Sequence, residues 1–465
     1  MTALTSATAG VVRPSTVRAA HIGLGSFHRA HQVWATELAN RALLADGADA
    51  DTLAGYASYT GRRPDAALRL AAQDGLYHLL VKGKAGDHTE LVGALTHPLD
   101  GGSADAGLLA ADAPVSVVTL TITEAGYRRN VDGGLDTDDP DVVHDIALLS
   151  FGASGDTGLR TAPARIVAAV RGRAAAGQPP LAVVSCDNLS GNGNALARVV
   201  HELTATALPD LVDTMTATSF VNTMVDRITP RTVDDDRSTV HALTGFGDAD
   251  PVPCEPFTEW LLAGAFPSGH PSWDRGGARF VEDVQPFEHR KLWLLNGAHS
   301  LLAYVGGLRG YETVDAAMGD ADCVRSMNAW WDDAAAQLVL PDAEVTAYRE
   351  ALTERFTNPR IRHLLKQIAG DGSQKLPVRL VPVLTSTRAA GGACAAGVTV
   401  AAAYVLHLRG IGLPVTDVAA ERMTQSASGP LASAAPRVLD LLSPGLGEDA
   451  ALVADVVSTA QALGR

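Results

Sequence analysis

The sequence predicts an α/β protein of two domains, in which a parallel sheet covered by helices is followed by a mostly α-helical domain. In the first half, short β-rich runs alternate with helical segments, which is the pattern of a parallel sheet with helices on its faces. These runs are VRAAHIG, TLAGYASYT, VSVVTLTIT, PLAVVSCDN and TATSFVN. Helical patterns dominate after Pro286, so we expect the domains to span residues 1–285 and 286–465.

The composition is that of a globular protein that binds small molecules. The chain has 465 residues, of which 46% are hydrophobic and 19% charged, enough for two or three well-buried cores. Its net charge of -15 argues against a nucleic-acid partner, because proteins that bind phosphate backbones concentrate lysine and arginine. We therefore expect a metabolic protein with a small-molecule substrate.

Cysteine usage and the apolar segments predict a cytoplasmic protein without a membrane partner. The four cysteines are Cys186, Cys254, Cys323 and Cys394. They form no C-x-x-C pair, so neither a zinc knuckle nor a disulfide framework is expected. The first fourteen residues lack the basic and apolar regions of a secretory signal. The most membrane-like run, GGACAAGVTVAAAYVLHLRG, is rich in small residues and predicts a closely packed core helix.

Three further stretches complete the predicted elements. The stretch between Tyr77 and Pro98 predicts additional, antiparallel strands. The acidic stretch at residues 130–145, NVDGGLDTDDPDVVHD, predicts a solvated surface loop. In the second domain, residues 289–308 and 323–340 carry long helical patterns.

The stretch HIGLGSFHRAHQ opens like a nucleotide-binding turn and predicts a Rossmann-type N-terminal domain. Ile22 ends a predicted strand, and Gly23 and Gly25 are the first two glycines of G-x-G-x-x-G. These glycines permit a tight turn and the close approach of a pyrophosphate, which the N-terminus of the following helix would face. A purely structural glycine turn remains the alternative.

The third glycine of this motif is replaced by His28. Without that glycine, the helix is expected to pack less closely on the strand. Arg29, in the first turn of the helix, would add positive charge near the phosphates. A metal site formed by His21, His28 and His31 is a weaker alternative, because no carboxylate or cysteine accompanies them at ligand spacing.

A second group of polar residues lies in EHRKLWLLNGAHS. On an α-helix that advances about 100° per residue, Glu288, Lys291, Asn296 and His299 fall within an arc of about 140°. Apolar residues interleave with them, which is unusual for a solvated face and predicts a partly buried pocket wall. An ordinary amphipathic helix with polar residues placed by chance is the alternative.

Two strand ends carry further polar residues. Asp187 and Asn188 follow an apolar strand at the sheet edge where open α/β sheets bind ligands, although such residues also commonly shape turns. Asp226 and Arg227 follow another strand and are equally consistent with a buried structural ion pair.

Together these motifs resemble the polyol-specific long-chain dehydrogenases, a family that includes mannitol 2-dehydrogenase and fructuronate reductase. The resemblance extends from Ala20 to Arg379, and its K-x4-N-x2-H and G-x-G-x-F-H-R-A-H-Q patterns are specific. The motifs occur in the family's order: HIGLGSFHRAHQ, TLTITEAGY, SCDNLSGNG, MVDRITP, CEPFTEW, KLWLLNGAHS and DGSQKLPVR.

The resemblance implies an active site between a Rossmann-type domain and a helical domain, without a metal. It makes Lys291 the catalytic lysine, and it makes Asn188 and Asn296 the amides that polarise the carbonyl. His299 becomes a residue that orients the substrate. Glu288 matches a carboxylate near the lysine that relays protons to solvent.

The same resemblance and motifs assign the binding residues. The residues expected at the cofactor are Ile22, Gly23, Leu24, Gly25, Ser26, Phe27, Arg29, Arg62, Thr123 and Glu124. The residues expected at the substrate are Val225, Asp226, Gln367 and Lys375.

The chemistry agrees with these roles. A neutral lysine can take the hydroxyl proton of a secondary alcohol if burial lowers its pKa from about 10.4 toward about 7 to 8. Two positioned amides then stabilise the charge that develops on the oxygen, each by ~2.7 to 4 kcal/mol.

The expected cofactor is NAD, with NADP as the alternative. An acidic residue at the end of the second strand usually binds the ribose 2′-hydroxyl of NAD, whereas arginine suits the 2′-phosphate of NADP. Here YTGRRPD places Arg62 and Arg63 in that region, so the preference for NAD rests on the family resemblance.

The expected substrate is a polyol, a ketose or a hexuronate. D-mannitol and D-fructose rank slightly ahead of D-mannonate and D-fructuronate. Gln367 stands where some mannitol dehydrogenases carry arginine, and Arg379 is either a carboxylate ligand or a structural ion-pair residue. From another class, a dinucleotide-binding sensor without turnover would use the same fold.

Overall fold

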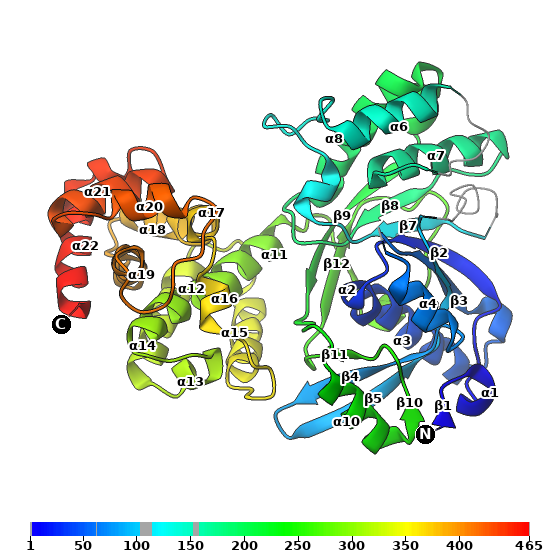
Figure 1. Cartoon of the computed structure of the whole chain (residues 1–465), viewed down its shortest axis with the longest axis horizontal. Helices are drawn as coiled ribbons and strands as arrows, with labels where there is room; N and C mark the ends of the chain where they lie inside the picture. Colours follow the sequence, from blue (N-terminus) through cyan, green and yellow to red (C-terminus); the bar gives the residue numbers. More distant parts are fainter. Residues whose placement is uncertain (1, 62, 103–113, 152–157, 465) are drawn as a thin grey trace. The chain divides into compact units, whose positions relative to one another are not determined.

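The chain divides into two compact units, Met1–Gln285 and Pro286–Arg465. The computed structural model describes residues 2–61, 63–102, 114–151 and 158–464. Figure 1 shows that the first unit contains the β-strands, while the second is built from helices.

The first unit is organised around an eight-stranded sheet with the strand order β13-β12-β9-β8-β7-β2-β3-β6. From β6 to β9 all neighbouring strands are parallel, and β12 then runs antiparallel to β9. The parallel part has the 3-2-1-4-5-6 order of the Rossmann fold, which confirms the predicted fold class. Its strands are β2 (Thr16–Ile22), β3 (Ala54–Tyr59), β6 (Leu95–Leu99), β7 (Val117–Leu120), β8 (Ala182–Ser185), β9 (Ser219–Asp226), β12 (Glu259–Ala263) and β13 (Arg279–Phe280).

Helices cover both faces of this sheet and create two hydrophobic cores. Neighbouring strand residues point to opposite faces, so Val117 lies in one core and Val118 in the other. Helix α3 (Gln32–Ala45) packs on the first face, and α7 (Ala162–Ala175) and α8 (Asn192–Ala207) pack on the second (Figure 1). Burial on both faces explains why the central strands are apolar runs.

The remaining helices of this unit are α1 (Ser6–Ala9), α2 (Ser26–Ala30), α4 (Asp65–Ala71), α6 (Pro140–Ser150), α9 (Val212–Met215) and α10 (Asp234–Thr244). Its short 3-10 turns are η1 (Ala50–Thr52), η2 (Glu124–Tyr127), η3 (Pro209–Leu211) and η4 (Trp273–Gly276).

The expected antiparallel strands after Tyr77 are present, with one difference. Strands β4 (Tyr77–Gly83) and β5 (Gly86–Val92) are antiparallel, and β11 (Val252–Cys254) joins β4. However, β6 leaves this group and pairs in parallel with β3. The Glu37 carboxylate accepts hydrogen bonds from the backbone of Gly93 and Ala94, which fixes the chain between β5 and β6. A short pair, β1 (Thr2–Ala3) and β10 (Phe246–Gly247), lies apart.

We expected the acidic stretch at residues 130–145 to be a loop, but only its first half is one. Its second half begins α6, whose N-cap Asp139 accepts hydrogen bonds from the backbone of Asp141 and Val142. Arg128 forms ion pairs with Asp139 at 2.7 Å and with Asp141 at 2.8 Å. The acidic residues are favourable there because the N-terminus of a helix is partly positive.

The second unit is helical throughout its named elements. One long helical segment runs from Gln285 to Gly306 as α11 (Gln285–Arg290), η5 (Lys291–Gly297), α12 (Ala298–Leu301) and η6 (Leu302–Gly306). It is followed by α13 (Val314–Met318), α14 (Ala321–Ala335), α15 (Asp342–Phe356), α16 (Leu365–Ala369), α17 (Gly372–Arg379), α18 (Val381–Ala389), α19 (Ala395–Leu408), α20 (Ala420–Ser426), α21 (Leu431–Leu442), η7 (Leu446–Glu448) and α22 (Ala450–Leu463).

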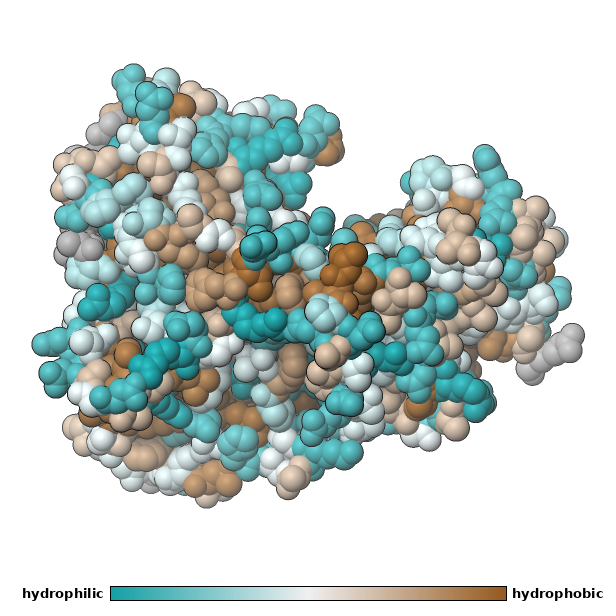
Figure 2. Space-filling model, turned by 180° about the vertical axis from the view of Figure 1, so that it is seen from behind, coloured by the Kyte–Doolittle hydropathy of each residue, from teal (hydrophilic) through white to brown (hydrophobic). Residues whose placement is uncertain are grey.

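The Ala- and Gly-rich run forms α19, a core helix buried along nearly its whole length, as predicted. In the part of the chain that the structure describes, no helix has both the length and the apolar character needed to cross a membrane. All four cysteines are buried free thiols. On the face shown in Figure 2, hydrophilic residues are widespread and hydrophobic ones appear in separate groups.

A pair of stacked histidines replaces the third glycine between α2 and the sheet. The rings of His21 and His28 lie parallel with centroids 3.3 Å apart, and neither side chain is exposed. His21 Nδ1 lies 2.7 Å from Thr119 Oγ1, and His28 Nε2 lies 3.0 Å from Ser58 Oγ. Burial lowers the pKa of His21 to about 3 and also lowers the pKa of His28, so both rings are neutral.

Restoring the glycine motif with His28→Gly is therefore expected to destabilise the protein. The change removes a buried ring, leaves the Ser58 hydroxyl without its partner and places glycine in a helix, for a total cost of about 3 kcal/mol. Urea unfolding would measure the loss. His88→Gly, at an exposed histidine of β5, is the control. Equal stability of His28→Gly and the wild type would contradict a packing role for the histidine pair.

Candidate active site

The turn after β2 forms the floor of a cavity at the carboxyl edge of the sheet. Gly23 has a φ of +111°, and a Cβ atom at this position would lie 2.3 Å from the carbonyl oxygen of Thr121. Only glycine fits such a backbone and such a contact. The backbone N–H groups of Gly23 and Leu24 donate to the carbonyl oxygen of Tyr59, which ties the turn to β3.

Two adjoining cavities open along this edge. The larger has a volume of about 1050 Å³ and the smaller about 470 Å³, and both are lined by residues 121–123 and Ala125. Ile22 and Gly23 line the larger cavity, and Phe27 lines the smaller one. The position of both cavities, beyond the carboxyl ends of parallel strands, is where α/β sheets bind dinucleotides.

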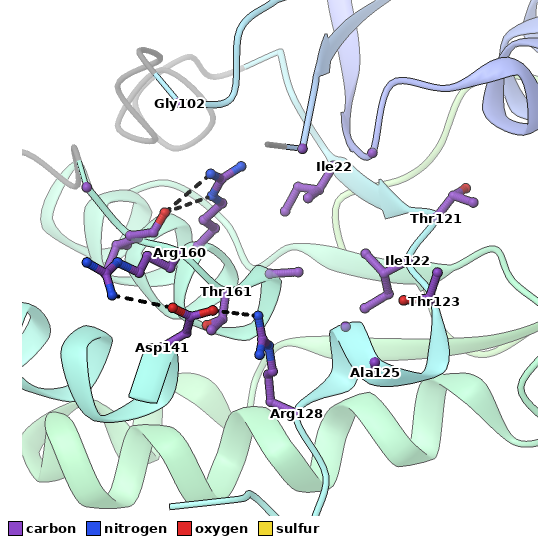
Figure 3. A pocket seen from close by; sticks show the side chains of 17 residues that line it. Ile22, Gly102, Thr121, Ile122, Thr123, Ala125, Arg128, Asp141, Arg160 and Thr161 are labelled. Atoms are coloured by element: carbon purple, nitrogen blue, oxygen red, sulfur yellow. Dashed lines mark hydrogen bonds and ion pairs between the residues drawn. The ribbon is translucent and has the colours of Figure 1, made fainter. Parts of the chain in front are cut away.

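Arginine side chains give the larger cavity a cationic wall (Figure 3). Asp141 lies between Arg128 and Arg160, with ion-pair distances of 2.8 and 3.4 Å. Arg165, in the first turn of α7, donates two hydrogen bonds to the carbonyl oxygen of Leu159, and burial lowers its pKa. These groups are suited to an anionic ligand.

The smaller cavity contains the polar residues that follow β8. Asp187 accepts a hydrogen bond from Tyr127 Oη at 2.6 Å and another from the backbone of Leu189 at 3.1 Å. Burial raises the pKa of Asp187 to about 6. Asp187 thus shapes the turn, whereas Asn188 is exposed and lines the cavity with Phe27.

Most of the residues expected at the cofactor lie on this edge. Those that line a cavity are Ile22, Gly23, Phe27, Thr123 and Glu124. Leu24 is buried beneath the turn, Gly25 is the N-cap of α2 and Ser26 begins that helix. Arg62 lies outside the described residues, and the neighbouring Arg63 is exposed.

The expectation that Arg29 faces the phosphates is not met by the structure. Its side chain is 2% exposed and forms an ion pair with Asp250 at 3.5 Å. It also donates to the Asp250 carbonyl oxygen at 2.5 Å and lies over the Tyr77 ring. With these partners, the guanidinium of Arg29 is part of the protein interior and does not face the cavity. The sequence did not reveal Arg160 and Arg165 as cavity residues. They lie just before α7 and in its first turn, far along the chain from the glycine turn, and no local motif marks them.

The histidine-rich turn gives no sign of a metal site. The face-to-face stacking of His21 and His28 is that of packed rings, and His31 Nδ1 lies 2.6 Å from the Phe27 carbonyl oxygen. Among the described residues, no three His, Cys, Asp or Glu side chains are grouped as ligands for an ion.

The helix that carries the predicted catalytic residues contains two π-helical stretches, η5 and η6, rather than the uniform α-helix that we expected. A π-helical turn shifts the backbone pairing from i→i+4 to i→i+5 and often occurs at functional sites. Lys291 begins η5 and Asn296 lies near its end. The arc calculated for a regular α-helix therefore does not describe how their side chains are arranged.

Two indole N–H groups donate hydrogen bonds to backbone carbonyls within η5, where the helical pairing is irregular. Trp330 Nε1 donates to the carbonyl oxygen of Trp293 at 2.8 Å, and Trp331 Nε1 donates to that of Leu294 at 2.9 Å. The N–H of Ala298, which a regular α-helix would direct at Leu294, donates to Leu295.

The close approach of Trp330 requires the glycine of the NGAH sequence. A Cβ atom on Gly297 would lie 2.7 Å from Trp330 Nε1. The glycine therefore allows the indole to reach the backbone beside Asn296.

The other predicted residues of this unit have distinct environments. Lys291 and Asn296 are partly exposed, whereas Glu288 and His299 are buried. The His299 ring lies 4.6 Å from that of Phe356 and makes an edge contact with His363 at 4.7 Å.

The expected substrate residues are divided between the two units. Val225 and Asp226 are buried at the end of β9 in the first unit. In the second unit, Gln367 is exposed on α16, while Lys375 on α17 donates to the carbonyl oxygens of Ile368 and Gly370.

Arg227, which follows Asp226, has a structural environment. It donates to the carbonyl oxygens of Glu255 and Ala30 from a buried position. These two bonds join the end of α2 to the segment that follows β11.

We expect Trp330→Phe to lower both stability and kcat, because it removes the indole hydrogen bond to the carbonyl of Trp293 in the stretch that carries Lys291 and Asn296. The stability cost should be about 1 to 3 kcal/mol. Trp260→Phe is a matched control, since the Trp260 indole is buried with no hydrogen-bond partner among the described residues. Thermal unfolding and steady-state kinetics would compare the two variants. If Trp330→Phe and Trp260→Phe lowered stability and kcat to the same extent, the indole hydrogen bond of Trp330 would be unimportant.

Known proteins share both units of this chain. The mannitol dehydrogenase Rossmann-domain model matches residues 17–275, and the mannitol dehydrogenase C-terminal-domain model matches residues 283–463. Mannitol 2-dehydrogenase of Cereibacter sphaeroides is 36% identical over 83% of this chain and 80% of its own length. D-mannonate oxidoreductase of Escherichia coli K12 is 35% identical over 82% of this chain and 79% of its own length.

A solved structure extends the match to nearly the whole chain. The ternary complex of Pseudomonas fluorescens mannitol 2-dehydrogenase with NAD and D-mannitol has a TM-score of 0.77 and 32% identity. The match covers 98% of this chain and 92% of that one. The protein therefore belongs to the mannitol dehydrogenase family of oxidoreductases.

Proposed function

We propose that this protein interconverts a secondary alcohol and a ketone on an open-chain sugar derivative, with NAD as the cofactor and Lys291 as the general base. The observation that carries this proposal is the placement of Lys291 and Asn296 on one π-helical stretch, with His299 in the next turn. The relatives support it, because they are named mannitol 2-dehydrogenase and D-mannonate oxidoreductase.

The carboxyl edge of the sheet fits a dinucleotide. Gly23 leaves the turn after β2 open to a pyrophosphate, and the two adjoining cavities extend from there along the sheet. Residues Ile22 to Phe27, Thr123 and Glu124 would hold the cofactor. When bound, the nicotinamide takes up or supplies the hydride.

The side chains of this protein handle the proton and the oxygen. In the oxidation direction, the neutral Lys291 amine takes the hydroxyl proton while the carbinol carbon gives up its hydride, and a ketone results. Asn188 and Asn296 are assigned to donate amide hydrogen bonds to the oxygen as it becomes anionic. His299 would orient the substrate, and Glu288 would pass the proton from Lys291 toward solvent.

The two kinds of named relative support this substrate class. A neutral polyol such as D-mannitol requires hydrogen-bonding groups, whereas a sugar acid such as D-mannonate also requires a cation. The sequence ranked D-mannitol slightly ahead of D-mannonate. The environment of the cations on α17 gives a reason to reverse this order.

We expect Lys291→Ala to reduce kcat by several orders of magnitude with little loss of dinucleotide affinity, because the lysine acts on the alcohol. Following NADH oxidation with a panel of keto-sugars would measure turnover, and titration of NADH fluorescence would measure binding. Near-normal kcat at neutral pH would contradict the assignment. A wild-type protein that binds NADH but turns over none of these sugars would favour a sensor.

We expect the kcat/KM for NADH to exceed that for NADPH by about tenfold. The physical reason is the family's use of NAD together with Asp100, whose carboxylate accepts a hydrogen bond at 3.2 Å from Thr60, the residue that follows β3. Comparing both cofactors in the wild type and in Asp100→Ala would test this. A strong NADPH preference in the wild type would mean that the cationic residues of this region determine the choice.

A further inference from the structure

A guanidinium with no counter-ion among the described residues lies beside the helix of Asn296 and His299. Arg379 is the last residue of α17, and its Nη1 lies 3.4 Å from Ser300 Oγ. This contact uses one of five N–H donors, and no described carboxylate forms an ion pair with Arg379. Burial lowers its pKa to about 10. Charges in such positions are normally paired, so this one has the character of a binding group.

A second cation increases the positive charge at this place. Lys375 lies one helical turn before Arg379, a spacing at which like charges repel. Burial and then the charge of Arg379 lower the pKa of Lys375.

The acidic groups whose charges act on Lys375 form hydrogen bonds around the turn that begins α17. Asp417 accepts hydrogen bonds from the backbone and hydroxyl of Ser373, and Asp371 accepts one from the backbone of Val418. Their charges act on Lys375, but neither carboxylate reaches the guanidinium of Arg379 as an ion pair.

The cations lie next to a residue already assigned to the substrate. Burial, followed by the charges of Arg355, Arg379 and Lys375, lowers the pKa of His363 to about 4, so its ring is neutral at working pH. The same ring contacts His299. Arg379 and Lys375 therefore act electrostatically on the ring that contacts His299.

Arg379 also meets the catalytic helix close to Asn296. Its contact, Ser300, follows His299 directly and donates its hydroxyl to the Asn296 carbonyl oxygen at 3.1 Å. Four residues correspond to about 6 Å along a helix axis. An open six-carbon chain has a similar length, so a substrate whose reacting oxygen binds Asn296 can extend to the guanidinium.

We propose that Arg379 binds the carboxylate of the substrate, which makes the substrate pair an aldonate and the corresponding keto-uronate, such as D-mannonate and D-fructuronate. This inference rests on the proposed function. The planar fork of an arginine matches the two oxygens of a carboxylate, and a neutral polyol would leave the charge uncompensated.

The test compares D-fructuronate and D-fructose as substrates with NADH. The wild type should have a kcat/KM about 100-fold higher for D-fructuronate, and Arg379→Gln should lower this ratio about 100-fold, chiefly through KM. Arg379→Lys, which keeps the charge but not the fork, should lower it about tenfold. Arg362→Gln is the control. The Arg362 side chain is 74% exposed, and its ion pair with Glu312 is long, at 3.9 Å.

Direct binding gives a second readout. Calorimetric titration with sodium D-mannonate should show binding to the wild type and to Arg362→Gln, with at least tenfold weaker binding to Arg379→Gln. A wild type that prefers D-fructose, or Arg379 variants with an unchanged substrate ratio, would overturn the proposal while leaving the Lys291 mechanism intact. If Arg379→Gln does not fold, the ratio in Arg379→Lys decides in the same way. Failure to reduce any keto-sugar would instead overturn the proposed function.

Discussion

The helix that carries Lys291 and Asn296 is held by two indole hydrogen bonds to its backbone. Trp330 and Trp331 donate to the carbonyl oxygens of Trp293 and Leu294 inside the π-helical stretch. A buried carbonyl that lacks a donor costs about 1 to 3 kcal/mol, so these two bonds stabilise a stretch whose helical pairing is irregular.

A different constraint shapes the cofactor side of the first unit. The turn after β2 lies against Thr121 so closely that Gly23 cannot carry a side chain. In the usual motif a third glycine brings the helix onto the strand, but here two neutral stacked rings, His21 and His28, fill that space. The helix is short and its arginine, Arg29, faces the interior, so positive charge at the cavity comes from elsewhere.

Charge is distributed unevenly in this acidic protein. The chain carries a net charge of -15, yet arginines line the larger cavity, and Arg379, one helical turn after Lys375, contacts Ser300 beside His299. A cation within an acidic protein attracts anionic ligands locally while the remaining surface repels them. In our proposals this pattern serves two anions, the dinucleotide and the substrate carboxylate. Burial, rather than ion pairing, is the main influence on the pKa of Arg379.

The sequence by itself determined the features that depend on local or periodic patterns. Apolar runs and the Gly23 turn predicted the parallel sheet, and the spacing of Lys291, Asn296 and His299 contributed to the resemblance by which the family was correctly predicted. Asn188, at a strand end, lines a cavity at the carboxyl edge of the sheet, where parallel strands end together. These features follow from backbone geometry that each segment specifies for itself.

Only the tertiary structure decided the features that depend on partners distant in the chain. The carbonyls of the π-helical stretch accept hydrogen bonds from tryptophans 37 positions away, a pairing that no local pattern reveals. Arg29 was assigned to the cofactor from its place in a motif, yet Asp250 draws it into the core. Arg379 was left open between an ion pair and a ligand, and in the fold its side chain contacts Ser300 rather than a described carboxylate, which supports our proposal of a ligand. The energy of a charged or polar group is set by what surrounds it in space, and the order of residues alone does not contain that information.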